Sequence, residues 1–164
     1  MNRCYTREKY IEEVQQLREK VPEIELTTDI IVGFPGETEA DFKETLSLVE
    51  QVGYSAAYTF MYSPRKGTAA ATMPDQIPDE VKHDRLERLN EVQSRVLRNG
   101  NIKYIGTYGE VLVEGCDHRS EPMAYGKLSN FKMVYFPGDD SLVGSMRNVK
   151  ITGSQNNSLI GELV

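Results

Sequence analysis

The chain has 164 residues, of which 39% are hydrophobic and 27% are charged, so it is long enough for one good core or for one moderate and one small core. Its net charge of −6 argues against a protein that holds nucleic acid by electrostatic attraction alone, because that mode needs clustered lysines and arginines. No apolar run approaches the about 18 residues of a membrane span, and no secretory signal begins the sequence; with two cysteines far apart, we expect a cytoplasmic protein without a membrane partner.

The first part of the sequence alternates helix signals with strand signals. Thr6 can cap a first helix, and Thr38 with Asp41 can form a capping box for a second helix, which Gly53 ends. Between and after these helices lie apolar or aromatic runs bounded by turn residues, a pattern typical of strands. In chain order we predict a helix over 6–20, a strand over 24–34 that is buried on both faces, a helix over 39–52 and a strand over 54–62.

This order of elements is the repeating pattern of a β/α layer. Two parallel strands with two helices make a poor independent domain, so we expect part of a β/α (TIM-like) barrel. A proline-rich loop over 63–78 precedes a long helix, which we expect to run to about Asn99 and to end at Gly100. Its arginines are mixed with acidic residues, which favours a solvated face over a stripe that contacts RNA.

From Gly106 the pattern changes to short strands without a helix. Clusters of Gly, Asp, Ser and Asn separate them, and five short strands predict a small closed barrel of the OB kind. We therefore place a domain boundary near Ile105 and Gly106, with the partial β/α barrel and its connecting helix in 1–105 and the small barrel in 106–164. The predicted fold class is α/β plus all-β. The strands of the small barrel are expected over 108–114, 124–128, 131–137, 147–153 and 158–164.

Cysteines and histidines offer no obvious catalytic centre. Cys4 and Cys116 stand alone in the sequence, so neither fits a zinc or iron–sulfur motif. His83 and His118 have no paired nucleophile beside them. We expect no metal site and no catalytic residue among these side chains.

Two charged residues next to the predicted strands are candidates for ligand contacts, and one of them follows a strand at the carboxyl end, where β/α proteins bind ligands. Asp29 precedes an apolar run, where an unpaired charge would be costly, so it either contacts a ligand or pairs with Arg3 or Arg65 across the sheet. Arg65 follows the second strand, where it can clamp a carboxylate or phosphate or remain solvated. The residues alone leave both pairs of alternatives open.

The small barrel carries cations interleaved with aromatic rings, the mixture that proteins use to bind single-stranded nucleic acid. Some of the rings must instead fill the core of so small a barrel, and the alternation of the sequence does not decide which face is exposed. The residues concerned are Arg119, Lys127, Asn130, Phe131, Lys132, Tyr135, Arg147 and Lys150.

Several segments, in the same order, resemble the radical S-adenosylmethionine methylthiotransferases. The final part is similar to the TRAM domain of that family, and because separate segments match in order the resemblance covers the whole chain. The matching segments are residues 1–6 (MNRCYT), 28–38 (TDIIVGFPGET), 62–70 (YSPRKGTAA), the helix start PDEVK at 78–82, and 126–138 (GKLSNFKMVYFPG) with 159–163 (LIGEL).

The resemblance implies a tRNA-modifying enzyme that adds a methylthio group to C2 of N6-isopentenyladenosine next to the anticodon. The sequence motif around Arg65 resembles this branch, whereas the branch that acts on a ribosomal protein tends to carry an acidic residue at that position. A further branch, which acts on N6-threonylcarbamoyladenosine, also tolerates arginine at that position and stays an alternative. A stand-alone RNA-binding module, or an interaction module with an exposed sheet edge, are alternatives from other classes.

The family uses S-adenosylmethionine and two [4Fe-4S] clusters, and the six cysteines that hold the clusters are missing from this sequence. The chain therefore resembles a C-terminal fragment, which we expect to be inactive by itself, to carry no bound cofactor, and to work with the N-terminal domains of the same enzyme and the anticodon stem-loop of tRNA. By resemblance, cofactor contacts fall on Asp29, Ile31, Gly33, Phe60 and Tyr62, and RNA contacts on Arg65, Lys127, Asn130, Lys132, Arg147 and Lys150.

Overall fold

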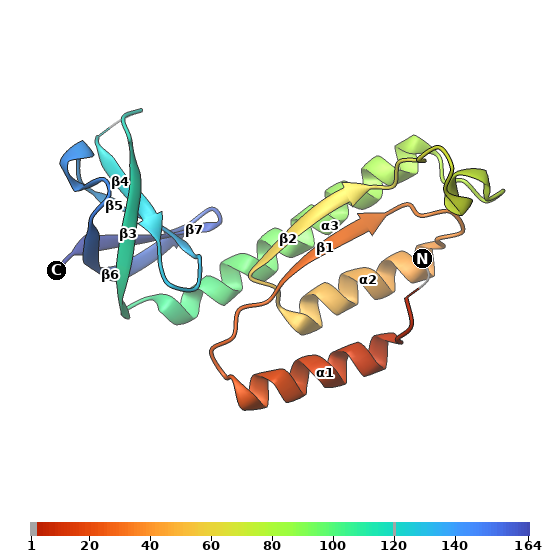
Figure 1. Ribbon diagram of the computed structural model, residues 1–164, viewed down its shortest axis with the longest axis horizontal. Coiled ribbons are helices and arrows are strands. Elements are labelled where there is room, and N and C mark those ends of the chain that lie inside the picture. Colours follow the sequence, from red (N-terminus) through yellow and green to blue (C-terminus); the bar gives the residue numbers. More distant parts are fainter. Residues whose placement is uncertain (1–2, 120) are drawn as a thin grey trace. The chain divides into compact units, whose positions relative to one another are not determined.

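The computed structural model describes residues 3–119 and 121–164, which form two compact units (Figure 1). The first unit extends to Leu97 and the second covers Arg98–Val164. Among the described residues, no helix combines the length and the apolar character that crossing a membrane requires.

The first unit is a two-stranded parallel sheet with helices packed on one of its faces. Three helices contribute side chains to a core against the inward side of the sheet, where Val14, Phe42 and Leu89 cluster with Val32. The elements are α1 (Arg7–Lys20), β1 (Thr27–Val32), α2 (Glu39–Val52), β2 (Ala56–Met61), a 3-10 turn (Ala69–Thr72) and most of α3 (Asp79–Asn101).

The helix ends lie where the capping residues predict. Thr6 accepts a hydrogen bond from the N–H of Lys9 at the start of α1, and Thr38 and Asp41 form the reciprocal capping box at the start of α2. Gly53 ends α2 in the left-handed conformation, with a φ of 65°. Gly100 does not act in this way: it has no positive φ, and α3 continues to Asn101 before a 3-10 turn over Ile102–Tyr104.

The prediction that the first strand is buried on both faces is wrong. Exposure alternates along β1, so that Ile30 and Val32 face the helices while Asp29 and Ile31 are exposed. The apolar run predicts a strand correctly, but it cannot predict whether the second face is covered, since covering depends on packing partners that a run of apolar residues does not specify.

The second unit is a closed five-stranded barrel, which confirms the predicted fold class. Its strand order is β3-β4-β5-β7-β6, with antiparallel pairing throughout except between β5 and β7. The strands are β3 (Tyr108–Asp117), β4 (Met123–Lys127), β5 (Met133–Pro137), β6 (Met146–Gln155) and β7 (Ser158–Leu163), with a 3-10 turn over Asp140–Leu142. The barrel core is made of Val111, Val113, Ala124, Val134, Phe136, Val149, Ile151 and Leu159.

The segment before the barrel strands packs onto the barrel. Tyr104 lies against the barrel core, and the ammonium of the buried Lys132 donates a hydrogen bond to Asn101 Oδ1 at 3.0 Å. The second unit thus begins inside α3, at Arg98. The domain boundary expected near Ile105 and Gly106 stays a prediction.

Candidate functional site

The sheet of the first unit presents large apolar side chains on its uncovered face. In the parallel register Asp29 lies beside Tyr58, and Ile31 beside Phe60. Ile31 is 38% exposed, Phe60 51% and Tyr58 65%. A contiguous exposed apolar face on a sheet usually marks a surface that binds a ligand or another part of a protein.

A cavity of about 610 Å³ opens where β1 and β2 end. This is the edge at which parallel sheets bind ligands, because the loops that follow neighbouring strands meet there. Side chains from the outer face of both strands and from the loop after β2 form its walls. The lining residues are Asp29, Ile31, Phe34, Phe60, Met61, Tyr62, Ser63, Arg65, Thr68 and Ala70.

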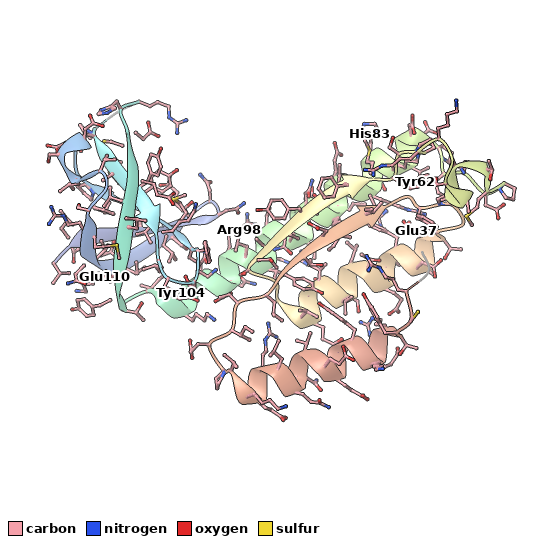
Figure 2. All side chains as sticks on the ribbon, in the orientation of Figure 1. Glu37, Tyr62, His83, Arg98, Tyr104 and Glu110 are labelled. Atoms are coloured by element: carbon pink, nitrogen blue, oxygen red, sulfur yellow. The ribbon has the colours of Figure 1, made fainter. Side chains whose placement is uncertain are left out.

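Tyr62 lines the cavity and carries a hydroxyl that has no partner among the described residues. Its ring packs edge-on against Phe34, with 5.2 Å between the ring centroids, and the ammonium of Lys82 lies 5.8 Å from the centroid of the Tyr62 ring. The Tyr62 hydroxyl is buried and makes no hydrogen bond with any of the described residues. Buried hydroxyls are almost always paired, so an unpaired one singles out Tyr62, which is labelled in Figure 2, as a candidate ligand contact.

The turn after β1 is held by a buried ion pair. Gly33 has a φ of 72° and donates its N–H to Glu37 Oε2 at 3.0 Å, while Glu37 Oε1 lies 2.8 Å from Nη1 of the buried Arg85. A β-carbon at residue 33 would lie 2.4 Å from Lys82 Cγ. Gly33 is therefore required both for its backbone conformation and for the close approach of Lys82.

The structure brings most of the predicted cofactor contacts together. Asp29, Ile31, Phe60 and Tyr62 all line the cavity, as does Arg65, which the resemblance assigned to RNA instead. Among the described residues no ion pair joins Asp29 to Arg3 or Arg65.

The remaining predicted cofactor contact, Gly33, shapes the turn beside the cavity and is not among its lining residues. Some residues that do line the cavity were not predicted from the sequence. Phe34 and Ser63 line the cavity but were not singled out. Their position within two residues of the ends of the two strands was the signal that could have found them.

Among the predicted RNA contacts of the barrel, the two outward lysines lie near acidic side chains. Lys127 is 3.2 Å from a Glu114 oxygen and Lys150 is 3.9 Å from a Glu162 oxygen, while Arg147 is exposed.

Two others are used within the barrel itself. Asn130 donates to the Tyr104 hydroxyl at 3.0 Å, and the ammonium of Lys132 is buried against Asn101. Lys132 thus faces inward with Val134 and Phe136, whereas Tyr135 faces outward.

The one group of potential metal ligands found among the described residues is Cys116, His118 and Asp140, whose ligand atoms lie within 4.8 Å of one another. His118 Nε2 is 3.0 Å from Asp140 Oδ2. Desolvation, and then the nearby carboxylates of Asp140 and Asp139, raise the pKa of the Cys116 thiol. A raised pKa disfavours the thiolate that metals bind. The two cysteines of the chain cannot supply the thiolates of a [4Fe-4S] cluster.

Residues 103–164, which include the barrel, match the TRAM domain family. The chain is thus a β/α unit followed by a TRAM domain.

The similarity is not limited to the barrel: the whole chain is homologous to tRNA methylthiotransferases. It is 51% identical over 164 residues to the tRNA-2-methylthio-N(6)-dimethylallyladenosine synthase of Thermoanaerobacter sp. (strain X514), of which it covers 35%. It is 50% identical to the synthases of the same name from Clostridium perfringens (strain SM101 / Type A) and Moorella thermoacetica, covering 37% of each. The chain thus spans little more than a third of the length of these relatives.

Proposed function

We propose that this chain serves in a tRNA methylthiotransferase that modifies N6-isopentenyladenosine (N6-dimethylallyladenosine) beside the anticodon. In this role the first unit contributes one wall of the S-adenosylmethionine site and the TRAM barrel binds tRNA. The observation that carries the first part is the cavity at the ends of β1 and β2, with its apolar wall and its unpaired Tyr62 hydroxyl. The names of the relatives support this nucleoside over N6-threonylcarbamoyladenosine.

The lining of the cavity fits an adenosyl group. Ile31 and Phe60 offer apolar surface to a flat base, and the buried Tyr62 hydroxyl is an unpaired group that could hydrogen-bond a ligand once it is uncovered. Arg65 lines the same cavity, and its guanidinium suits the carboxylate of the methionine portion. When bound, S-adenosylmethionine would supply the methyl group and the radical chemistry of the family; these side chains would bind and orient it.

Iron–sulfur clusters do not fit this chain. With two cysteines, one exposed and one half-buried, it lacks the thiolates that a cluster needs. We therefore assign the clusters to other domains of the enzyme, and we expect the 164 residues by themselves to cleave no S-adenosylmethionine. A cytoplasmic location, where tRNA is available, belongs to the same proposal.

Adding S-adenosylmethionine to the isotope-labelled chain tests the cofactor role. We expect amide NMR shifts to concentrate at residues 29–34 and 60–65. Phe60→Glu should abolish them, because it places a charge on the apolar wall. Leu17→Glu is a matched control, since it also replaces a partly exposed apolar side chain by glutamate, but on α1. Shifts that Phe60→Glu leaves intact would contradict the assignment.

Binding of an anticodon stem-loop RNA tests the second role. We expect affinity to fall as salt rises, because cationic side chains that neutralise phosphates release counterions. RNA binding together with no response to S-adenosylmethionine would favour the stand-alone RNA-binding module. No binding even at low salt would remove the RNA role of the barrel.

A further inference from the structure

The outward face of the barrel carries a row of three large side chains across neighbouring strands. Tyr125 of β4 is in register with Tyr135 of β5, and Tyr135 is in register with Ile160 of β7. The two tyrosine rings lie 5.5 Å apart at an interplanar angle of 39°. Gly115 leaves room for this row, because a β-carbon there would lie 2.4 Å from the Tyr125 hydroxyl.

The row ends in a cavity of about 290 Å³, the size of a small ligand. Tyr135 and Ile160 form an aromatic and apolar surface in it, and Asn156 at the turn between β6 and β7 supplies a polar wall. Asn156 holds a left-handed φ of 52°. The other lining residues are Asp117, Arg119, Glu121, Met123, Gln155 and Ser158.

Arg119 presents its guanidinium plane to solvent at the edge of this cavity. Its Nε lies 3.1 Å from Asp117 Oδ1 and 3.0 Å from Asp117 Oδ2, while the side chain stays 88% exposed. The side-by-side pairing with Asp117 fixes the orientation of the plane without burying it. A flat guanidinium held in this way can stack on a nucleobase, as RNA-binding proteins often arrange.

The charges of the cavity select the kind of ligand. Asp117 and Glu121 are both lining residues, so a phosphate group would meet two carboxylates beside a single arginine that one of them already neutralises. A neutral base meets no such repulsion. Carboxylate, amide and hydroxyl oxygens accept hydrogen bonds from an exocyclic amino group, which adenine, cytosine and guanine carry and uracil lacks.

We infer that the cavity bounded by Tyr135, Arg119 and Asn156 binds one unpaired nucleobase bearing an exocyclic amino group, stacked on the Tyr135 ring. This rests on the proposed tRNA role, and it identifies the face of the barrel that contacts RNA. That face is formed by β4, β5 and β7, the strands that carry Tyr125, Tyr135 and Ile160.

Fluorescence anisotropy with a labelled anticodon stem-loop and with labelled single-stranded oligo(A) and oligo(U) tests this site. Tyr135→Leu should weaken binding of the stem-loop and of oligo(A) by about tenfold, which corresponds to the loss of one stacked base. Tyr135→Phe keeps the ring and should bind as the parent does. Tyr108→Leu is the matched control, because Tyr108 lies on β3 beside β6 and is 66% exposed. Oligo(U) should bind more weakly than oligo(A).

The outcomes separate this inference from the broader proposal. If the parent chain binds the stem-loop and Tyr135→Leu binds it equally well, the base site is wrong while the tRNA role stands. A larger loss from Tyr108→Leu would move RNA to the face of β3 and β6 and would also overturn the site. If the parent chain binds none of the three RNAs, the tRNA role and the base site fall together.

Discussion

The two units solve the problem of strand edges in opposite ways. In the barrel every strand pairs on both sides, so its five strands leave no open edge. In the first unit β1 and β2 pair only with each other among the described residues, none of which covers one face of their sheet. The barrel therefore has a complete core within this chain, whereas the first unit keeps apolar surface and hydrogen-bonding edges available. The cavity of the first unit is lined in part by this exposed face of the sheet.

The largest effect is expected from breaking the barrel core. Phe136 is 0% exposed, so Phe136→Ala should cost about 4 kcal/mol of unfolding free energy by removing a buried ring and leaving a cavity. Denaturant unfolding followed by amide NMR would report each unit separately, and the loss should be confined to signals of the barrel. Phe131→Ala is the control: that ring is 81% exposed, and its loss should cost less than about 0.5 kcal/mol. Equal losses would mean that the barrel core is not the one described.

The next effect concerns the buried ion pair of the first unit. Arg85→Ala should cost about 3 kcal/mol, because it leaves the mostly buried Glu37 carboxylate without its partner. The loss should appear in the unfolding of the first unit and should loosen the turn at Gly33 that Glu37 holds. Arg95→Ala removes an exposed pair with Glu50 and should cost less than about 1 kcal/mol. A barrel that loses as much stability as the first unit would contradict the independence of the two cores.

A smaller effect is expected at the start of α2. Thr38→Ala removes a side chain that accepts a hydrogen bond from the Asp41 N–H, and it should lower the stability of the first unit by about 1 kcal/mol. Thr45→Ala, inside the same helix, should be close to neutral, because alanine favours the helix interior and the Thr45 hydroxyl bonds only to a carbonyl that is already in the helix. Thermal unfolding of both variants would measure the difference.

The smallest effect is a pH dependence in the barrel. Hydrogen bonds from Arg119 lower the pKa of Asp117 from 3.8 to about 2. A folded pKa below the unfolded value means that the pair stabilises the barrel fully above about pH 4, and that this contribution is lost as the pH falls through about 2. Carboxyl NMR titration should find the low pKa in the parent and a higher one in Arg119→Ala. An Asp117 that titrates identically in both proteins would show that the pair does not form in solution.

Much of the fold was predictable because short local signals determine it. Thr6, Thr38, Asp41 and Gly53 mark three helix ends, and each acts as its residue type predicts. The five short strands and their closure followed from turn residues and from chain length alone. Gly100 failed as a stop signal because a glycine ends a helix through a left-handed backbone, and the sequence does not reveal which glycine adopts it.

The candidate site was predictable only in part. The resemblance placed Asp29, Ile31, Phe60 and Tyr62 at the cofactor, and these side chains do share one cavity. Lys132 was assigned to RNA from the resemblance and from the mixture of cations and aromatic rings in the barrel, whereas its ammonium is buried against Asn101.

The sequence also could not predict that Tyr125 and Tyr135 lie on the outward face of the barrel. Inward and outward residues of β5 alternate among apolar and aromatic types, so only packing decides between them.

The parallel pair between β5 and β7 has a consequence for synthesis. β7, over residues 158–163, pairs with both β5 and β6. Until β7 is synthesised, each of those two strands has an unpaired edge. These residues must leave the ribosome before the barrel can close. The elements of the first unit have emerged well before that point. A nascent chain halted after residue 157 would expose ready templates for pairing with other chains, and we expect such products to aggregate or to need a chaperone.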